Sequence, residues 1–245
     1  FPLWVDPTLR ADAGADVIID GQAGHDRLGY SVSSAGDFNG DGKGDVIVGA
    51  HFDDNNSQNT SGSAFIFFGG ITGTKRADAD ADVIIDGQGA NDKFGYRVSS
   101  AGDFNGDGKG DVIVGAFADD NNSLGASGSA FIFFGGITGT KRADADADVI
   151  LNGQDAADEF GISVASAGDF NGDGTSDVIV GAHFDGNNGL NGSGSAFVFF
   201  SSGVFPSITF SDSTSSQKEN TTSVTIPVTL SKTSSSTVTI NYTVT

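Results

Sequence analysis

The chain has 245 residues, a formal charge of −20, 37 glycines and no cysteine. This acidic balance disfavours a nucleic acid or an anionic membrane surface as partner, because phosphate groups would be repelled. The lack of cysteine excludes disulfides and thiol chemistry, and no run approaches the roughly 20 apolar residues that a membrane-spanning helix needs.

Short strands separated by turns are expected along most of the chain. Residues 46–48 and 65–68 are apolar at consecutive positions, which is typical of strands buried between two neighbouring sheets. No stretch shows the 3.6-residue apolar period of an amphipathic helix, so the sequence predicts an all-β fold. After a lead-in segment over residues 1–15, the first strands are expected at residues 16–20, 30–35, 45–50 and 63–68.

These strands belong to a unit that occurs three times with a step of 66 residues. The opening strand, Asp16-Val-Ile-Ile-Asp20, returns at residues 82–86 and 148–152. Four short strands in each unit favour a β-propeller or another stacked repeat, in which each sheet buries its faces against the next one. We therefore expect three four-stranded blades within residues 16–203.

The phase of the repeat suggests how the blades could close into a ring. A lone outer strand at 16–20 precedes the first full unit, and the third unit ends at 195–200 without one. We predict that the front strand completes the last blade, which would remove exposed edges. Propellers usually have four to eight blades, so four alternatives stay open: two chains pool their blades, further blades lie outside this sequence, the ring is unusually small, or the position of the front strand is accidental.

A nine-residue acidic loop precedes the central strand of each unit. In Asp37-Phe-Asn-Gly-Asp-Gly-Lys-Gly-Asp45, oxygen-bearing side chains occupy positions 1, 3, 5 and 9, and glycine occupies position 6, where the chain turns sharply. Ca²⁺ takes six to eight oxygen ligands, and this spacing lets one short loop wrap them around the ion. The same residue types favour plain turns, but three crowded carboxylates would repel each other without a cation. Zinc is disfavoured because no histidine or cysteine accompanies them, and magnesium fits fewer protein ligands.

The loops at 37–45, 103–111 and 169–177 predict about three structural Ca²⁺ ions, one per repeat. Position 12 is valine rather than the bidentate glutamate of an EF-hand, so the last aspartate is expected to complete the shell as the strand begins. Position 7 would contribute its backbone carbonyl. The expected ligands are Asp37, Asn39, Asp41, Lys43 and Asp45; Asp103, Asn105, Asp107, Lys109 and Asp111; and Asp169, Asn171, Asp173, Thr175 and Asp177.

The repeat resembles the FG-GAP repeat of integrin α-subunit propellers over residues 16–200. Phe-Gly occurs at 94–95 and 160–161, the acidic loop follows, and Gly-Ala ends the next strand. The resemblance implies a β-propeller with Ca²⁺ in loops between the first and second strands on one face, and partner binding on the opposite face. Two features depart from the family: three units stand where the family fold has seven, and the proline after Gly-Ala is replaced by His51, Phe117 and His183.

A different composition begins after Phe200, where serine and threonine alternate with β-branched residues. This pattern is typical of half-buried sandwich strands, but residues 204–245 are too few for a sandwich of roughly 100 residues. We expect either a truncated domain or a segment that lends its strands elsewhere. The segment is similar to the start of a Calx-β domain, with Pro206-x-Ile-x-Phe210, Glu219-Asn220 and the 224–228 run Val-Thr-Ile-Pro-Val.

Catalysis is not expected from these residues. The three histidines are His25, His51 and His183; the latter two replace a family proline and have no histidine counterpart in the second repeat, which favours structural roles. No nucleophile elbow, two-histidine metal pattern or glycine-rich phosphate loop occurs. The acidic runs are interpreted as solvated loops, with weak extra calcium binding as the alternative; these runs are 53–56, 78–82 and 119–122.

Two functions fit these observations. The first is a calcium-rigidified, non-enzymatic module of a bacterial-type extracellular or cell-surface protein for adhesion or assembly, where free calcium is high. Its partner would be a protein, a glycan or neighbouring copies in a homo-oligomer or filament, joined by strand addition at open edges, with no direct membrane insertion. The second is an accessory region of a larger secreted, phospholipase-like hydrolase, whose catalytic residues would lie outside this chain.

Overall fold

The computed structural model describes residues 11–54, 57–120, 123–186 and 189–201, and the backbone of 208–210 and 228–230. The chain divides into two compact units, Phe1–Ser201 and Ser202–Thr245. In the second unit, β15 (Ile208–Phe210) pairs antiparallel with β16 (Val228–Leu230). The rest of the predicted Calx-β-like segment lies outside the described residues.

The regular secondary structure in the described part of the first unit is almost entirely β-strand, which confirms the predicted all-β class. Its three helices are single turns: α1 (Ala11–Gly14), α2 (Ala77–Asp80) and α3 (Ala143–Asp146). Its strands are β1 (Val17–Asp20), β2 (Ser31–Gly36), β3 (Asp45–Ala50), β4 (Ser63–Phe67), β5 (Gly73–Arg76), β6 (Val83–Asp86), β7 (Arg97–Gly102), β8 (Asp111–Ala116), β9 (Ser129–Phe133), β10 (Gly139–Arg142), β11 (Val149–Asn152), β12 (Ser163–Gly168), β13 (Asp177–Ala182) and β14 (Ser195–Phe199).

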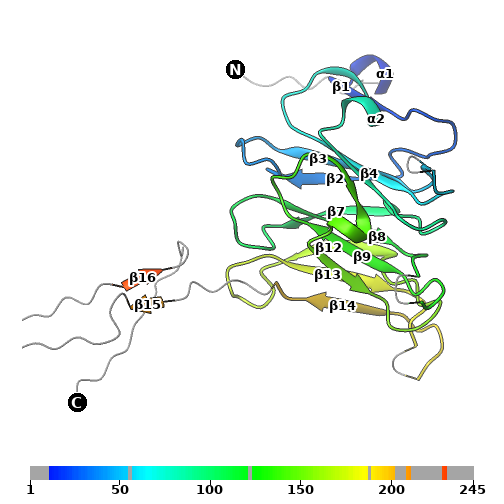
Figure 1. Ribbon diagram of the computed structural model, residues 1–245, viewed down its shortest axis with the longest axis vertical. Coiled ribbons are helices and arrows are strands. Elements are labelled where there is room, and N and C mark those ends of the chain that lie inside the picture. Colours follow the sequence, from blue (N-terminus) through cyan, green and yellow to red (C-terminus); the bar gives the residue numbers. More distant parts are fainter. Residues whose placement is uncertain are drawn as a thin grey trace, which may run out of the picture. The chain divides into compact units, whose positions relative to one another are not determined.

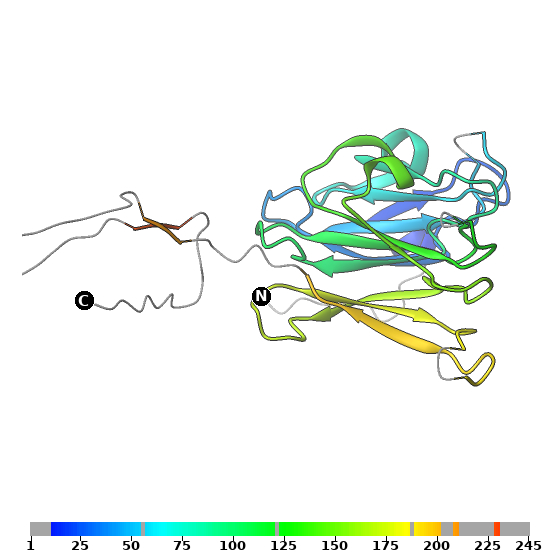
Figure 2. The ribbon, with the colours of Figure 1, turned by 60° about the horizontal axis from the view of Figure 1, so that its bottom comes forward.

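Each repeat forms one antiparallel sheet whose strands lie in chain order. The orders are β2-β3-β4-β6 in the first sheet, β7-β8-β9-β11 in the second and β12-β13-β14 in the third. Figures 1 and 2 show these sheets stacked face to face, and the first strands of successive sheets contact each other. This is the arrangement of propeller blades around an axis lined by their first strands.

Two polar strands that the sequence did not predict form parallel pairs. β10 pairs with β6, so part of the second repeat returns to the outer edge of the first sheet, and β5 pairs with β1 in a separate two-stranded sheet. Both have the sequence Gly-Thr-Lys-Arg, which lacks the apolar alternation of a strand. Lysine and arginine are common on edge strands, where they oppose pairing with other chains.

The predicted closure of the ring by the front strand is wrong for this structure. β1 pairs with β5, and the described part of the third sheet ends at β14, which pairs only with β13. β1 lies instead in a separate two-stranded sheet with β5, and its other edge is unpaired among the described residues. Pairing of that edge with a second chain stays a prediction.

The apolar core lies between the sheets and explains the apolar strand runs. Opposed residues on β3 and β4 pair valine with phenylalanine on one face and isoleucine with isoleucine on the other. In the second sheet the valine–phenylalanine face packs on the first sheet, and the isoleucine face packs on the third. All six residues of β8 are buried, as expected for the central strand of a sheet with a neighbour on each side.

The Gly-Ala end of each central strand marks the closest approach between sheets. A Cβ on Gly49 would overlap the backbone carbonyl of Gly95 in the second sheet, and a Cβ on Gly115 would overlap that of Gly161 in the third. At Gly181, in the last sheet, the obstructing atom is only the Ser163 hydroxyl. Glycine is therefore required at the first two positions for the sheets to approach each other.

Replacement of glycine in the central strands should distinguish the effect of sheet-to-sheet packing on stability from the effect of strand propensity. Gly115→Ala should lower the free energy of unfolding by about 1–3 kcal/mol, because a methyl group against a fixed carbonyl forces the sheets apart. Gly181→Ala is the matched control and should cost much less, since a serine side chain can rotate away. Urea unfolding of both variants measures this; equal losses would contradict the proposed close approach.

Candidate functional site

The acidic loops connect the first and second strands of each sheet, and all three lie at the same end of their sheets. Within the first loop, the first three acidic or amide side chains each accept a backbone N–H further along the chain. Gly42 donates to Asp37 Oδ2 at 2.9 Å, Asp41 donates to Asn39 Oδ1 at 2.8 Å, and Lys43 donates to Asp41 Oδ1 at 2.9 Å. The equivalent bonds recur in the other two loops. Short side chains of this kind favour such local bonds, which curl the loop into a tight ring.

The last aspartate of each loop is buried and ties three segments together. Asp45 Oδ2 accepts the N–H groups of Phe38 (2.8 Å) and Asn39 (3.2 Å), and its Oδ1 accepts that of Gly69 (2.7 Å) after β4. Asp111 and Asp177 repeat this pattern. The carboxylate joins the loop, the start of its own strand and the turn after the next strand. The predicted role of these three residues as calcium ligands stays a prediction.

Burial dominates the ionisation of one of these carboxyl groups. It raises the pKa of Asp111 to about 6, although the N–H donors of Gly135, Phe104 and Asn105 act in the opposite direction. The hydrogen bonds therefore only partly offset the cost of placing this carboxylate away from water.

The first aspartate of the first loop has an oxygen that suits a cation. Asp37 Oδ1 is buried and has no hydrogen-bond partner among the described residues. Asp41 is exposed, and its carboxylate lies 3.1 Å from the Lys43 ammonium, which with a further backbone bond lowers its pKa. The oxygen-only donor set fits a hard cation such as Ca²⁺.

The structure does not gather the three carboxylates of any loop around one point. Among the described residues, three acidic side chains with oxygens mutually within 4.8 Å occur in two other places: Asp26, Asp53 and Asp54, and Asp92, Asp119 and Asp120. In the loops, the last aspartate is turned toward backbone N–H groups instead. The sequence missed Asp26 and Asp92 because each lies far along the chain from its partners.

Two further expectations from the sequence are corrected here. Asp53 and Asp119, interpreted as parts of solvated loops, are buried. The acidic run 78–82 lies partly in the helical turn α2. Neither change was visible in the sequence, because buried carboxylates and helical turns of four residues leave no periodic pattern.

His51 packs in an aromatic cluster at the opposite end of the sheets from the acidic loops. Its ring centroid lies 4.3 Å from that of Tyr30, 4.6 Å from Phe52 and 5.1 Å from Tyr96. Burial first, and then nearby arginine and lysine side chains, lowers the pKa of His51 to about 4. A neutral, buried ring of this kind suits packing. His183 is more exposed and lies 3.7 Å from Glu159.

Comparison with known proteins identifies the repeats. The family model for the FG-GAP repeat matches residues 28–67, 94–133 and 160–199. The chain therefore contains three FG-GAP repeats, as the resemblance in the sequence implied. These matches end at residue 199, so the Calx-β-like segment stays a prediction.

Curated relatives of two kinds share these repeats. The chain is 32% identical over 162 residues to phosphatidylinositol-glycan-specific phospholipase D of Bos taurus, covering 64% of this chain and 19% of that protein. It is 32% identical over 184 residues to integrin alpha-PS2 of Drosophila melanogaster, covering 73% of this chain and 12% of the relative. With integrin alpha-5 of Xenopus laevis it shares 30% identity over 164 residues, covering 63% of this chain and 14% of the relative. Each match spans about a fifth or less of the relative. No helix in the described part of the chain is long and apolar enough to cross a membrane.

Two aspartates of the second loop should respond differently to substitution. Asp111→Asn should lower the free energy of unfolding by about 2–4 kcal/mol at pH 8, because hydrogen bonds to charged groups contribute about 1.5–3 kcal/mol each and an amide cannot accept at both ends. The loss should appear with or without calcium.

The exposed Asp107 provides the control. Asp107→Asn should leave the free energy of unfolding in EGTA nearly unchanged and reduce only the extra stability that calcium confers. Urea unfolding in EGTA and in millimolar CaCl₂ makes the comparison. Equal effects of the two substitutions in EGTA would contradict the structural role of Asp111.

Proposed function

We propose that this chain is a calcium-stabilised, non-enzymatic module of an extracellular or cell-surface protein that serves adhesion or supramolecular assembly. Its partner would be a protein, a glycan or neighbouring copies of the chain. One observation carries the proposal: the acidic loops join successive sheets, while the last described sheet presents an open apolar face.

The contacts of the acidic loops support a structural role for calcium. The backbone carbonyl of Asp37 accepts the N–H of Gly110 in the next loop (2.9 Å), and the carbonyl of Phe38 accepts that of Gly136 (2.7 Å). The Asp103 carbonyl accepts the N–H of Ser176 in the third loop in the same way (3.1 Å). An ion that ordered one loop would therefore stiffen its junction with the next sheet.

About three Ca²⁺ ions, one per loop, follow from this proposal. The side chains at positions 1, 3, 5 and 9 and the carbonyl at position 7 would hold each ion. The buried, unpartnered Asp37 Oδ1 supports this assignment in the first loop. An extracellular or surface location is proposed because sites of moderate affinity are filled at the millimolar calcium outside cells.

Equivalent phenylalanines in the three loops support assembly. Phe38 is fully buried between the first and second sheets and Phe104 is 7% exposed, whereas Phe170 is 66% exposed and stacks on Phe200. At the other end of the stack, Val32 is 65% exposed where its equivalent Val98 is 5% exposed.

Phe170 and Val32 lie on the two sides of one sheet-to-sheet contact, and on the side of Val32 the neighbouring Phe65 and Phe67 are already buried within the chain. Phe170 belongs to the side that packs on a following sheet, and Val32 belongs to the side that packs on a preceding one. A neighbouring copy could therefore continue the stack head to tail, which is the type of contact that generates rings or filaments.

The second candidate function is an accessory region of a larger secreted, phospholipase-like hydrolase. The similarity to phosphatidylinositol-glycan-specific phospholipase D favours it. The catalytic residues would then lie outside this chain. In either case, the Calx-β-like residues 206–245 are proposed as a further module or as strands lent to a neighbour.

Removal of calcium tests the stabilising role. With dissociation constants of about 0.1 mM, three sites in 1 mM calcium would contribute roughly 4 kcal/mol, since each adds about 1.4 kcal/mol. EGTA should therefore lower Tm by about 10 °C for a unit of this size. A triple variant, Asp41→Asn with Asp107→Asn and Asp173→Asn, should lose this response. An unchanged Tm of the wild type in EGTA would refute the calcium role.

The mass in solution tests assembly through the open face. In calcium, sedimentation should show wild-type species that grow with concentration, and Phe170→Ser should reduce them, because the exposed apolar side of the last sheet would be lost. Phe184→Ser removes another exposed phenylalanine outside the sheet face and should have no effect. A wild type that stays monomeric at high concentration would refute this part of the proposal.

A further inference from the structure

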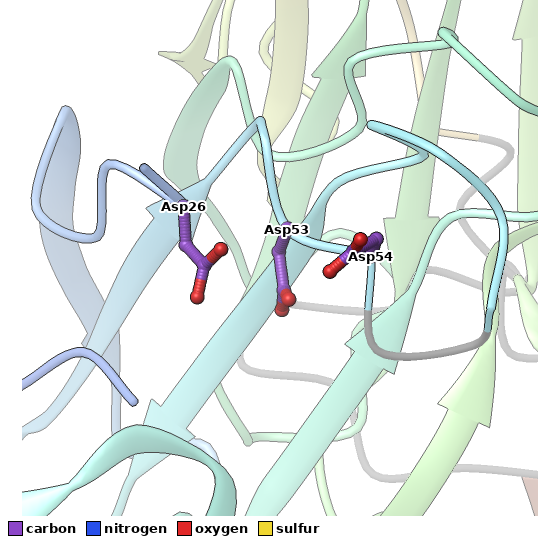
Figure 3. Close-up of side chains that lie close together, drawn as sticks. All are labelled: Asp26, Asp53 and Asp54. Atoms are coloured by element: carbon purple, nitrogen blue, oxygen red, sulfur yellow. The ribbon is translucent and has the colours of Figure 1, made fainter. Parts of the chain in front are cut away.

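A second group of acidic side chains lies at the end of the first sheet opposite the acidic loops. Asp26 lies between β1 and β2, and Asp53 and Asp54 follow β3. β2 runs toward the acidic loop and β3 runs back from it, so both segments meet at the far end. One carboxylate oxygen from each residue lies within 4.8 Å of the others. Figure 3 shows the three side chains side by side, with Asp53 between Asp26 and Asp54.

Backbone hydrogen bonds hold the three residues in place. The Asp26 carbonyl accepts the N–H of Phe52 (3.3 Å), and its Oδ2 accepts that of Ala23 (3.1 Å). The Asp53 N–H donates to the Ala50 carbonyl (3.0 Å), and its carbonyl accepts the N–H of Gly62 (2.9 Å). The carboxylates are therefore brought together by fixed backbone.

One buried carboxylate oxygen in this group, Asp53 Oδ2, has no hydrogen-bond donor among the described residues. Asp53 as a whole is 3% exposed. A buried carboxylate oxygen without a donor is costly unless a cation or ordered water meets it. Burial, and after it the charges of Asp26 and Asp78, raises the pKa of Asp53 to about 6; the Ser63 hydroxyl opposes this shift.

The basic side chains nearby do not neutralise these carboxylates. Arg27 and Lys93 lie over the Phe52 ring, each 4.3 Å from its centroid. The ion pairs found among the described residues lie elsewhere, at Asp41 and at Glu159. The negative charge of the three carboxylates is therefore not balanced by an ion pair, and a bound cation could balance it.

The second repeat contains the same arrangement. Asp92, Asp119 and Asp120 also place three oxygens within 4.8 Å of one another, and Gly89 donates its N–H to Asp92 at 2.7 Å as Ala23 does to Asp26. The third repeat keeps Asp158 and Asp185 but has Gly186 in place of the third carboxylate.

We propose that Asp26, Asp53 and Asp54 bind a divalent cation of the calcium type, and that Asp92, Asp119 and Asp120 bind a second one. Oxygens that share a Ca²⁺ at 2.3–2.6 Å lie at most about 5 Å apart, which fits the observed spacing. Water would fill the remaining positions. These sites are separate from the acidic loops, and each would clamp the segment before a sheet to the loop after its second strand.

Calcium titration of a variant without loop sites tests the proposal. The background is the full chain with Asp41→Asn, Asp107→Asn and Asp173→Asn. Isothermal titration calorimetry should show about two Ca²⁺ still bound, and adding Asp54→Asn and Asp120→Asn should weaken that binding at least tenfold. Both of these positions are exposed, so the fold should survive, and circular dichroism checks this.

The third repeat offers a gain of function in the same background. A Cβ at Gly186 would make only ordinary contacts, so Gly186→Asp should fold and raise the stoichiometry from about two to about three. Gly186→Ala is the matched control and should leave it at two. Folded background protein that binds no Ca²⁺, or residual binding unaffected by Asp54→Asn and Asp120→Asn, would overturn the proposal. Failure of the loop sites alone would appear differently, as wild type and background binding the same number of ions.

Discussion

Each sheet of this protein carries apolar side chains on both faces, so each needs a neighbour on either side to be stable in water. The second sheet satisfies this condition: its valine and phenylalanine face packs on the first sheet, and its isoleucine face packs on the third. The other features follow from this stacking. Glycine stands where two backbones approach most closely, and the phenylalanines of the first two acidic loops pack against the next sheet.

The two ends of each sheet have different chemistry because different connections meet there. At one end, a short acidic loop with its buried aspartate links a sheet to the next by backbone hydrogen bonds. At the other end, longer loops bring together aromatic rings, basic side chains and buried carboxylates. The first end is suited to holding the stack together. The second end gathers more varied chemistry.

The sequence predicted those features that local patterns encode. The 66-residue step, the apolar runs and the acidic loop led to the strands β2, β3 and β4 and their equivalents with end points within one or two residues. β5 and β10 were missed because Gly-Thr-Lys-Arg has no apolar face, and their stability comes from parallel pairing with a distant strand. β1 was expected in the third sheet, but it forms a separate two-stranded sheet with β5, a strand that the sequence did not reveal.

The candidate sites show the same division between local and distant information. The spacing of Asp37 to Asp45 identified a candidate loop. The sequence could not show that both carboxylate oxygens of Asp45 accept backbone N–H groups, one of which belongs to a residue after β4. The group formed by Asp26 and Asp53 depends on two strands of opposite direction bringing separate segments to one end. Such a group appears only after the strand pairing is known.

The parallel strands β5 and β10 also affect the order in which the sheets can form during synthesis. β6, the outer strand of the first sheet, receives its edge partner from the second repeat, and β1 receives its partner from the first. During synthesis, which proceeds from the N-terminus, the first sheet can therefore be completed only after β10 of the second repeat has emerged. The second repeat would thus supply the last strand of the sheet formed by its predecessor.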